Sequence, residues 1–288
     1  DINVCRVDTL ITLIRSTKCL RIRMKDIESV VIFCGGKGSR LNEVTGGLVP
    51  KPMVKIGHYP IIWHLINTYR LQGVKHIILC TGYLYDYFNR WFANLEINIT
   101  KNLIVKGGMV HKGTVAETKD LTIELIYTGN ETMTASRLAQ VKNFIRSDTF
   151  FLTYGDGLSD VNLNKLLEVH KNGNYSLTIT GVSPLGRFGE MEYEGTKITK
   201  FSEKPFDKRR RINGGFMCVD KSFIEKYLST NDFNMMLENT PFHLCAQDGK
   251  LGMYLHDGYW QCMDNPRDYE LLCKHADSVN PPWILKNE

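Results

Sequence analysis

The sequence predicts a single α/β domain built on a mixed, mostly parallel sheet. Continuous apolar runs, such as Val30–Cys34 and His76–Cys80, alternate with segments whose apolar residues have helical spacing. Such runs are typical of strands that are buried on both faces of a parallel sheet. In addition, no stretch rich in Pro, Gly or Ser divides the chain, and no internal repeat is visible. We therefore expect one domain with inserted loops.

The predicted elements follow one another from Ser29. The first strand, Val30–Cys34, runs into a glycine-rich loop, and the first helix, Ile61–Gln72, stops at Gly73. His76–Cys80 completes a strand–helix–strand unit. The remaining predicted strands are Leu121–Tyr127, Phe150–Tyr154, Ser176–Val182, Lys197–Ser202 and Gly214–Val219, and the remaining predicted helices are Tyr85–Asn94, Val161–Lys171 and Arg267–His275.

Residues 1–28 are expected to form an extension, and the domain is placed at 29–288. The extension has no signal-peptide cleavage site, and it holds six basic and two acidic residues up to Lys25. One interpretation is a basic amphipathic helix at a membrane surface. The weak periodicity favours a poorly ordered tail instead.

The composition excludes several classes of protein. Hydrophobic residues make up 43% and charged residues 23% of the 288 residues, as in ordinary globular chains, and no apolar run reaches the ~18 residues of a membrane span. The net charge of +5 falls mostly in the extension, so no nucleic-acid partner is expected. The eight cysteines form no Cys-x-x-Cys pair, which favours buried thiols in a reducing compartment, the cytoplasm.

The glycine-rich loop after the first strand is the strongest local signal. Glycines let a backbone turn present its N–H groups to an anion, and an arginine adds a fixed pair of donors for phosphate oxygens. The spacing fits neither the dinucleotide-binding fingerprint nor the Walker loop. We predict a phosphate-binding loop. It comprises Gly35, Gly36, Lys37, Gly38, Ser39 and Arg40.

Two further segments carry charges suited to phosphates and a metal ion. Lys51 lies between two prolines that restrict its backbone, although a rigid surface turn explains this string about equally well. Asp156 lies between two glycines after a predicted strand, where ligands bind in open α/β sheets. Mg²⁺ usually takes one or two protein carboxylates beside nucleotide phosphates. Asp264 follows another apolar strand and is a candidate to share that ion.

A third group of polar residues suits a sugar phosphate. Glu203 and Asn213 provide an acid and an amide that can share the hydroxyl groups of a sugar. Lys204 can face an anomeric phosphate. These residues predict a sugar-phosphate site.

In this order, the motifs resemble the sugar-1-phosphate nucleotidylyltransferases, and within that family most closely the cytidylyltransferases. The similarity runs from about Ser29 to Trp283. The strings that carry it are Pro50–Gly57, Tyr127–Gly129, Thr132–Thr134 with Arg137–Leu138, Tyr154–Gly157, Gly186–Gly189, Glu203–Pro205, Asn213–Phe216 and Trp260–Asp264.

The resemblance implies a Rossmann-like nucleotidyltransferase domain with a small sugar-binding part, a homo-oligomer and dependence on Mg²⁺. It implies transfer of a cytidylyl group from CTP to α-D-glucose 1-phosphate, with CDP-glucose and pyrophosphate as the products. The CDP-glucose would serve polysaccharide synthesis. Arg40, Lys51 and Asp156 would be catalytic, and Asp156 and Asp264 would bind the metal. The implied nucleotide-binding residues are Cys34, Gly35, Gly36, Lys37, Gly38, Ser39, Arg40, Lys51, Thr132, Arg137 and Gly155. The implied sugar-phosphate-binding residues are Arg187, Gly189, Glu203, Lys204, Asn213 and Gly214.

Other functions stay open. The chain has Thr-Ala-Ser-Arg at Thr134–Arg137 where the family has Thr-Gly-Gly-Arg, in a loop expected near the base. A different nucleotide or sugar phosphate is therefore an alternative. A non-catalytic nucleotide-sugar-binding homologue is another, although the retained Arg40, Lys51 and aspartates favour an enzyme. A glycosyltransferase would be expected to show an Asp-x-Asp metal motif in place of Gly-Asp-Gly.

Overall fold

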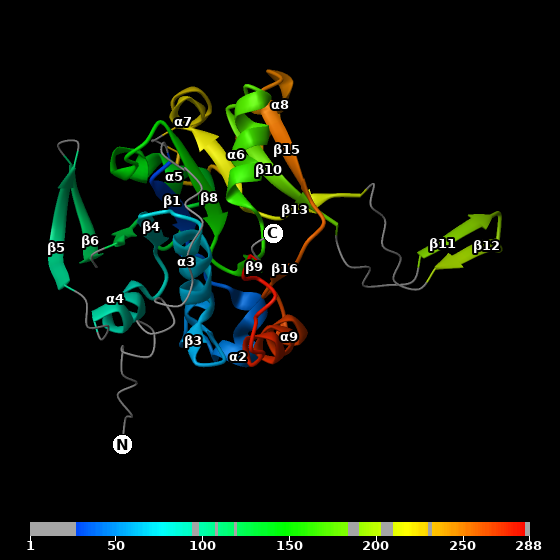
Figure 1. Cartoon of the computed structure of the whole chain (residues 1–288), viewed down its shortest axis with the longest axis horizontal. Coiled ribbons are helices and arrows are strands. Elements are labelled where there is room, and N and C mark those ends of the chain that lie inside the picture. Colours follow the sequence, from blue (N-terminus) through cyan, green and yellow to red (C-terminus); the bar gives the residue numbers. More distant parts are fainter. Residues whose placement is uncertain are drawn as a thin grey trace.

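The centre of the molecule is a ten-stranded sheet with helices on both faces (Figure 1). The computed structural model describes residues 27–93, 98–106, 109–117, 120–183, 190–202, 210–229 and 232–285. The four central strands are parallel. Their spatial order is β8 (Thr149–Tyr154), β1 (Ser29–Phe33), β4 (His76–Thr81) and β7 (Thr122–Tyr127). The predicted α/β class with a mixed sheet is confirmed.

Antiparallel pairing extends the sheet on both sides of this parallel centre. Beyond β7, a hairpin that the sequence did not predict adds β6 (Met109–Glu117) and β5 (Asn98–Lys106). Beyond β8, the sheet continues through β14 (Met217–Asp220), β10 (Leu177–Val182) and β13 (Ile212–Asn213), and β15 (Leu251–His256) pairs in parallel with β10. The strictly parallel part is therefore the centre of the sheet.

The two faces of the sheet pack against different helices. The side chains of β1 point alternately to the two faces, and both faces are buried, so its core residues are all apolar. Val30 and Ile32 belong to one core cluster, whereas Val31 and Phe33 belong to the other. The first cluster includes side chains of α3 (Ile61–Leu71), α4 (Tyr85–Ala93), α6 (Leu163–Asn172) and α9 (Pro266–Ala276). The second includes side chains of α5 (Thr134–Val141), α7 (Lys221–Tyr227) and α8 (Thr240–Gln247).

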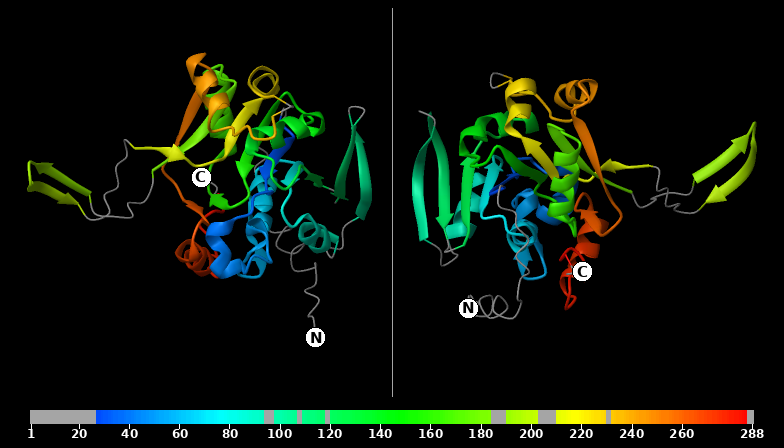
Figure 2. Two further views of the ribbon diagram at one scale, coloured as in Figure 1. Left: turned by 180° about the vertical axis from the view of Figure 1, so that it is seen from behind. Right: turned by 45° about the horizontal axis from the view of Figure 1, so that its top comes forward.

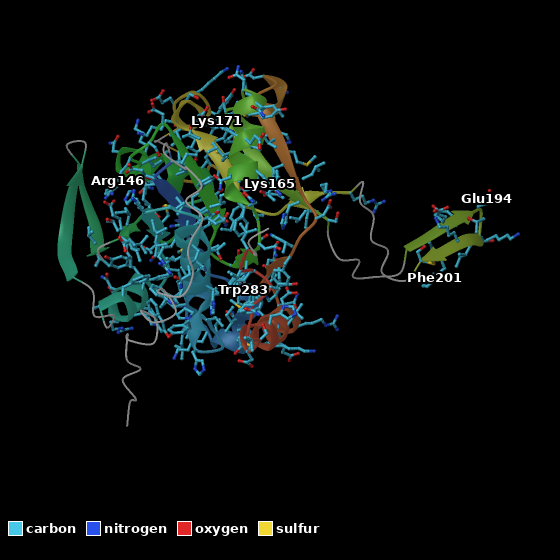
Figure 3. The ribbon with its side chains drawn as sticks, in the orientation of Figure 1. Arg146, Lys165, Lys171, Glu194, Phe201 and Trp283 are labelled. Atoms are coloured by element: carbon cyan, nitrogen blue, oxygen red, sulfur yellow. The ribbon has the colours of Figure 1, made fainter. Side chains whose placement is uncertain are left out.

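Short elements complete the described chain. They are the helix α2 (Asn42–Thr45), the 3₁₀ helices η1 (Ser39–Leu41), η2 (Lys51–Met53) and η3 (Lys142–Phe144), and three strand pairs, β2 (Lys55–Ile56) with β3 (Tyr59–Pro60), β9 (Gly157–Ser159) with β16 (Trp260–Cys262), and β11 (Glu190–Glu194) with β12 (Lys197–Ser202). The β11–β12 ribbon stands away from the domain in every view (Figure 2). Near the C-terminus, Trp283 is buried against His64 and Tyr259 (Figure 3).

Each predicted helix and strand is present, with ends shifted by a few residues. The largest shift is at the predicted strand over 214–219, which begins only at Met217. The reason is local, because Gly215 and Phe216 both have positive φ angles, of 71° and 45°, which a strand does not accommodate. Helices α5, α7 and α8 were not predicted.

Residues 1–26 of the predicted extension lie outside the described residues, and Ile27 is already buried in the core. The six cysteines in the described part are free thiols, and four of them are buried, as expected. Within that part, no helix is long and apolar enough to cross a membrane.

Candidate active site

The predicted phosphate-binding loop and the predicted metal ligand both lie at the carboxyl edge of the parallel strands. Gly35–Arg40 follows β1, and Gly155–Asp156 follows β8, its neighbour in the sheet. Neighbouring parallel strands end at the same edge, which is where ligands bind in α/β proteins. The sheet topology therefore brings together two segments that are more than 100 residues apart.

The glycine-rich loop packs directly on Lys51. Gly38 has a φ angle of +61°, and a Cβ atom there would lie 2.8 Å from the Cβ of Lys51. Only glycine meets both conditions at low cost. From Gly36 to Arg40 the loop is open to solvent or half-buried, so its backbone is accessible to a ligand.

Lys51 extends its ammonium group between two carboxylates. Its Nζ atom lies 2.6 Å from Asp156 Oδ2 and 2.6 Å from Asp264 Oδ1. Pro50 precedes the η2 turn with φ −65°, and Pro52 is buried within it, so the backbone of Lys51 is fixed on both sides, as predicted. Because the two carboxylate oxygens contact the same nitrogen atom, they lie close enough together for one cation to contact both.

The pairing of β9 with β16 explains why the two aspartates meet. Gly157 lies opposite Cys262 in this antiparallel pair, and the Met263 backbone N–H donates to the Asp156 carbonyl at 2.9 Å. On the other side, Gly155 packs so closely that an added Cβ would lie 2.9 Å from the Phe33 carbonyl oxygen. Asp156 is thus held between β1 and the chain that leads to Asp264.

Lys51 and Asp264 stabilise each other's charged forms. Burial alone would lower the pKa of Lys51, but the charge of Asp156 and the hydrogen bonds to both carboxylates raise it above its usual value. Burial alone would raise the pKa of Asp264, but the hydrogen bond and charge of Lys51, with the charge of Arg40, lower it. The site therefore holds a cationic lysine and an ionised Asp264 at neutral pH.

The glycine-rich loop carries two more cations. Arg40 Nη1 lies 3.9 Å from Asp264 Oδ2, with a side chain that is 82% exposed. Lys37 Nζ lies 2.7 Å from Glu131 Oε1, and both side chains are exposed. Exposed pairs of this kind contribute little to stability, so both cations can exchange their partners for ligand phosphates.

Arg137 lies beneath the glycine-rich loop. Its buried guanidinium donates to the carbonyl oxygens of Thr81 and Gly35 and to the Thr128 hydroxyl, at 2.7 to 3.1 Å. These bonds tie the ends of β4 and β7 to the loop after β1. In this structure Arg137 supports the loop from below, and its direct contact with a nucleotide stays a prediction. Cys34, also buried, donates its backbone N–H to Cys80.

The segment expected as a loop beside the base is the first turn of a helix. Ala135 and Ser136 lie in α5, where both are buried. Ser136 Oγ donates to the Asp232 carbonyl, and the Ala135 N–H donates to the Met235 carbonyl at 3.1 Å. The two substitutions relative to the family pattern therefore pack against the 232–235 segment. Thr132, also largely buried, lies just before this helix.

Glu238 belongs to the site and was missed by sequence reasoning. Its carboxylate accepts hydrogen bonds from Thr134 Oγ1, at 3.0 Å, and from the Tyr154 hydroxyl. Asn213 Nδ2 donates to the same Tyr154 oxygen at 3.3 Å. Because Tyr154 immediately precedes Gly155, this network joins α5 to the Asp156 loop. No motif surrounds Glu238, so no local signal could have found it.

Asp268, the second missed residue, supports Asp264 from behind. Its Oδ2 atom accepts hydrogen bonds from the Asp264 N–H at 3.1 Å and from Asn265 Nδ2 at 2.8 Å. Asn265 in turn caps α9 by accepting from the Asp268 N–H. An Asn followed three residues later by Asp has the spacing of a capping box, which is a signal that the sequence offered.

The predicted sugar-phosphate residues are described only in part. Asn213 is exposed beside Tyr154, and the buried Gly214 accepts a hydrogen bond from the Trp260 indole N–H at 2.7 Å. Asn213 Oδ1 also accepts from the Gly215 N–H. Arg187, Gly189, Glu203 and Lys204 lie outside the described residues.

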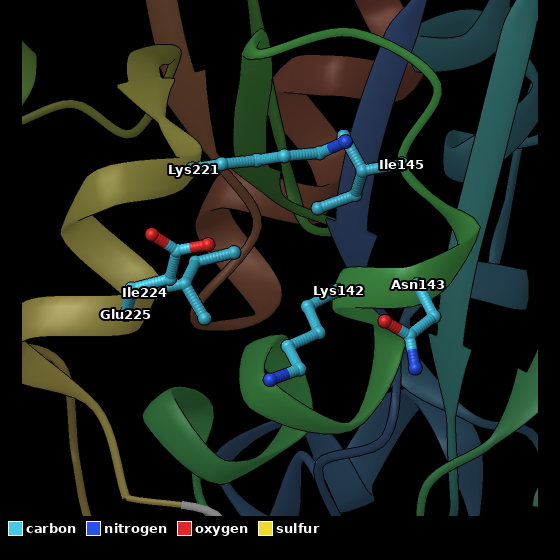
Figure 4. A pocket seen from close by; sticks show the side chains of 6 residues that line it. All are labelled: Lys142, Asn143, Ile145, Lys221, Ile224 and Glu225. Atoms are coloured by element: carbon cyan, nitrogen blue, oxygen red, sulfur yellow. The ribbon is translucent and has the colours of Figure 1, made fainter. Parts of the chain in front are cut away.

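A separate cavity of about 320 Å³ lies beside the C-terminal end of α5, whereas Thr134 is at the N-terminal end of this helix (Figure 4). Its walls come from η3 and α7, near the start of β8, and none of the predicted site residues lines it. The lining residues are Lys142, Asn143, Ile145, Lys221, Ile224 and Glu225.

Comparison with known proteins agrees with this geometry. A family model described as nucleotidyl transferase matches residues 29–271. The chain belongs to the nucleotidyl transferase family. This nucleotidyl transferase is 35% identical over 258 residues to a glucose-1-phosphate cytidylyltransferase of Salmonella typhi, covering 88% of this chain and 97% of that protein. It is 36% identical to a probable glucose-1-phosphate cytidylyltransferase of Bacillus subtilis, covering 88% and 95% of the two chains.

Solved structures share the fold of this nucleotidyl transferase at lower identity. HddC from Yersinia pseudotuberculosis superposes with a TM-score of 0.61 at 23% identity, over 86% of this chain and 98% of that one. The inositol-1-phosphate CTP transferase from T. maritima gives a TM-score of 0.57 at 16% identity, over 88% and 98%. These likenesses confirm the fold.

Proposed function

We propose that this enzyme transfers the cytidylyl group of CTP to α-D-glucose 1-phosphate, giving CDP-glucose and pyrophosphate. The observation that supports the proposal most directly is the convergence of Lys51 with Asp156 and Asp264 beside a glycine-rich loop. Such a site is suited to phosphoryl chemistry. The choice of CTP and glucose 1-phosphate rests on the two relatives that carry this activity in their names.

The reaction requires positioning and charge neutralisation more than acid–base chemistry. An oxygen of the sugar phosphate, already anionic, attacks the α-phosphorus of CTP in line. The bond from the α-phosphorus to the oxygen that bridges the α- and β-phosphates breaks, and pyrophosphate leaves with that oxygen. No proton has to be removed from the attacking oxygen. Lys51 and Arg40 supply positive charge where it develops on the α-phosphate and on the leaving group.

The two aspartates fit a Mg²⁺ ion. Both are carboxylates, both are about one-third exposed, and both are held on the same ammonium group, so that one ion with phosphate ligands can reach both. We propose that Asp156 and Asp264 hold Mg²⁺ together with the nucleotide. Bound there, the ion supplies positive charge to the phosphates. Lys51 keeps the carboxylates in place when no ion is bound.

The rest of the site divides between the two substrates. We assign the triphosphate to the backbone of Gly35–Arg40, and the nucleoside to the Thr132 side, with Arg137 as the support of the loop. Asn213, which donates to the Tyr154 hydroxyl, and the adjacent Gly214 suit the sugar phosphate. Arg187, Gly189, Glu203 and Lys204 complete that assignment as predictions from the sequence.

Pyrophosphate release tests the proposal. The purified protein is assayed with Mg²⁺ and glucose 1-phosphate, and CTP, UTP, dTTP, ATP and GTP are compared in parallel. Release with CTP is the expected result. Release with another nucleotide alone would overturn the choice of base and keep the chemistry. Failure with every nucleotide, repeated with other sugar phosphates, would favour a non-catalytic nucleotide-sugar-binding protein.

A further inference from the structure

The indole ring of Trp260 packs directly on the turn that carries Asn213 and Gly214. Its Nε1–H group donates to the Gly214 carbonyl oxygen at 2.7 Å. A Cβ atom on Gly214 would lie 3.2 Å from Trp260 Nε1 and 2.8 Å from Val182 Cγ1, so only glycine fits there at low cost. Trp260 is half-buried in β16, where it lies opposite Ser159 of β9. The indole therefore reaches the turn from the same strand pair that places the two site aspartates.

The peptide group between Gly214 and Gly215 links Trp260 to Asn213. Its carbonyl oxygen accepts the hydrogen bond from the indole, and its N–H group, that of Gly215, donates to Asn213 Oδ1 at 2.9 Å. The C=O and N–H bonds of a trans peptide lie in one plane and point in opposite directions. One hydrogen bond on each side therefore fixes how this plane is rotated.

Hydrogen bonds also hold the backbone before and after this peptide group. The Gly214 N–H donates to the Thr180 carbonyl oxygen at 2.9 Å, and the Phe216 N–H donates to Thr153 Oγ1 at 3.2 Å. Neither glycine has a Cβ atom that would resist rotation of the peptide between them, and Gly215 has a φ angle of +71°. Without the indole N–H, this one peptide group could turn over at low cost while its surroundings stay in place.

The rotation of this peptide decides which atom of the Asn213 amide is offered to a ligand. An N–H group can only donate, so the Asn213 atom that faces Gly215 is the oxygen, and Nδ2 is the other arm of the amide. One hydrogen of Nδ2 is donated to the Tyr154 hydroxyl oxygen at 3.3 Å. Because Asn213 is exposed, the second hydrogen is accessible to a ligand oxygen. A peptide that turned over would instead direct its carbonyl oxygen at Oδ1 and repel it.

We propose that Trp260 is a positioning residue for the sugar phosphate. Its indole N–H fixes the Gly214–Gly215 peptide, and this peptide holds the Asn213 amide as a donor toward an oxygen of the sugar phosphate. This inference rests on the proposed function, in which Asn213 binds that substrate. Because β16 also leads to Asp264, one strand holds both the orienting indole and a proposed metal ligand.

Steady-state kinetics test the proposal. Trp260→Phe keeps an aromatic ring and removes the N–H group, so it is expected to raise the KM for glucose 1-phosphate by about 10-fold, the effect of roughly one hydrogen bond. The KM for CTP and kcat should change little. Asn213→Ala is expected to raise the same KM by a similar factor. Because Trp260 acts through Asn213, the double variant should resemble either single variant.

The matched control is Trp63→Phe, which changes another half-buried tryptophan, in α3, where the ring contacts Trp91. This variant should keep the wild-type KM for both substrates. An unchanged KM for glucose 1-phosphate in Trp260→Phe overturns the proposal. So does a double variant whose KM rises by the product of the two single factors, because Trp260 and Asn213 would then act independently.

A measurement without substrate separates this proposal from the proposed function. The ¹H–¹⁵N signals of the Asn213 side-chain amide are assigned by their loss in Asn213→Ala. They are expected to shift in Trp260→Phe and to stay in place in Trp63→Phe, and unchanged signals in Trp260→Phe overturn the proposal whatever the activity. If the wild-type chain releases no pyrophosphate, the proposed function fails, and the Kd for glucose 1-phosphate from calorimetry replaces the KM in the same comparison. A wild-type chain that does not bind glucose 1-phosphate either overturns both.

Discussion

The ammonium of Lys51 lies 2.6 Å from the carboxylate of Asp156, although 105 residues separate them in the chain. The glycine-rich loop packs on Lys51, and the end of β1 packs on Gly155, which immediately precedes Asp156. Asp264 completes the cluster, in which the ammonium group of Lys51 holds the two carboxylates together. Changes at any of the three side chains should therefore affect both chemistry and stability.

The first prediction concerns the charge of Asp156. Asp156→Asn keeps the shape of the side chain and removes its charge, so it should lower kcat for pyrophosphate release by about 100-fold or more while the chain still folds. The matched control is Asp148→Asn, an exposed aspartate just before the other end of β8. Near-wild-type turnover in Asp156→Asn would show that this carboxylate holds no essential ion.

The second prediction uses the pKa shifts at Lys51 and Asp264. The lowered pKa of Asp264 stabilises the fold above its usual value of 3.8, and this stabilisation is lost as the pH falls through the folded pKa. The raised pKa of Lys51 stabilises the fold below 10.5, and this stabilisation is lost as the pH rises through its folded value. Between these limits both contributions are present.

Lys51→Met should therefore lower the melting temperature by about 5 °C near pH 7. The difference from wild type should shrink as the pH falls through the lowered folded pKa of Asp264, where this carboxylate loses its charge and with it the pairing to Lys51. Thermal unfolding followed from about pH 3 to 9 measures it. The control is Lys226→Met, which removes the exposed pair with Asp248 and should change little at any pH. A pH-independent loss in Lys51→Met would contradict the pairing.

How much of this site the sequence could predict depends on the range of each signal. Gly38, Lys51 and Asp156 were predictable because glycines, prolines and the end of an apolar strand constrain the backbone locally. The proximity of Asp264 to Lys51 and Asp156 was not predictable, because it results from the register in which β16 pairs with β9. Glu238 reaches the site through contacts with Thr134 and Tyr154, each more than 80 residues away.

The fold shows the same division. Val30–Cys34 and His76–Cys80 are buried on both faces, and this makes their sequences uniformly apolar and easy to assign. In contrast, the β5–β6 hairpin interleaves polar residues among its apolar ones, and its place in the sheet depends on pairing with β7. Phe216 takes a positive φ angle that no sequence rule assigns to phenylalanine.

The third prediction concerns metal binding by Asp264. If Asp156 and Asp264 hold Mg²⁺ with the nucleotide, Mg²⁺ should raise the melting temperature of the CTP-bound protein further than CTP alone does. Asp264→Asn should remove this additional increase. Asp257→Asn, an exposed aspartate paired with Arg211, serves as the control. An undiminished Mg²⁺-dependent increase in Asp264→Asn would exclude it as a ligand.

The fourth prediction separates support of the loop from contact with substrate. Arg137→Lys keeps the charge but cannot reach the two carbonyl oxygens and the hydroxyl that the guanidinium serves, so it should cost about 2–4 kcal/mol in urea unfolding. The KM for CTP should rise, with the KM for glucose 1-phosphate much less affected. Arg146→Lys, an exposed arginine, is the control. Full stability with a raised KM would instead indicate that Arg137 binds the nucleotide directly.

The fifth prediction concerns Glu238 as a positioning residue. Glu238→Gln replaces one acceptor oxygen by an amide donor, so either Thr134 or Tyr154 loses its acceptor. Because Tyr154 also contacts Asn213, the KM for the sugar phosphate should rise by about 10-fold, the effect of roughly one hydrogen bond, with kcat changed less. Thr134→Val removes the hydrogen bond to Glu238 and the one from the Leu237 N–H, but it keeps the bond between Tyr154 and Glu238, so it should leave that KM closer to wild type. An equal effect of both variants on kcat alone would contradict a role on the sugar side and would place Glu238 with the reacting phosphates.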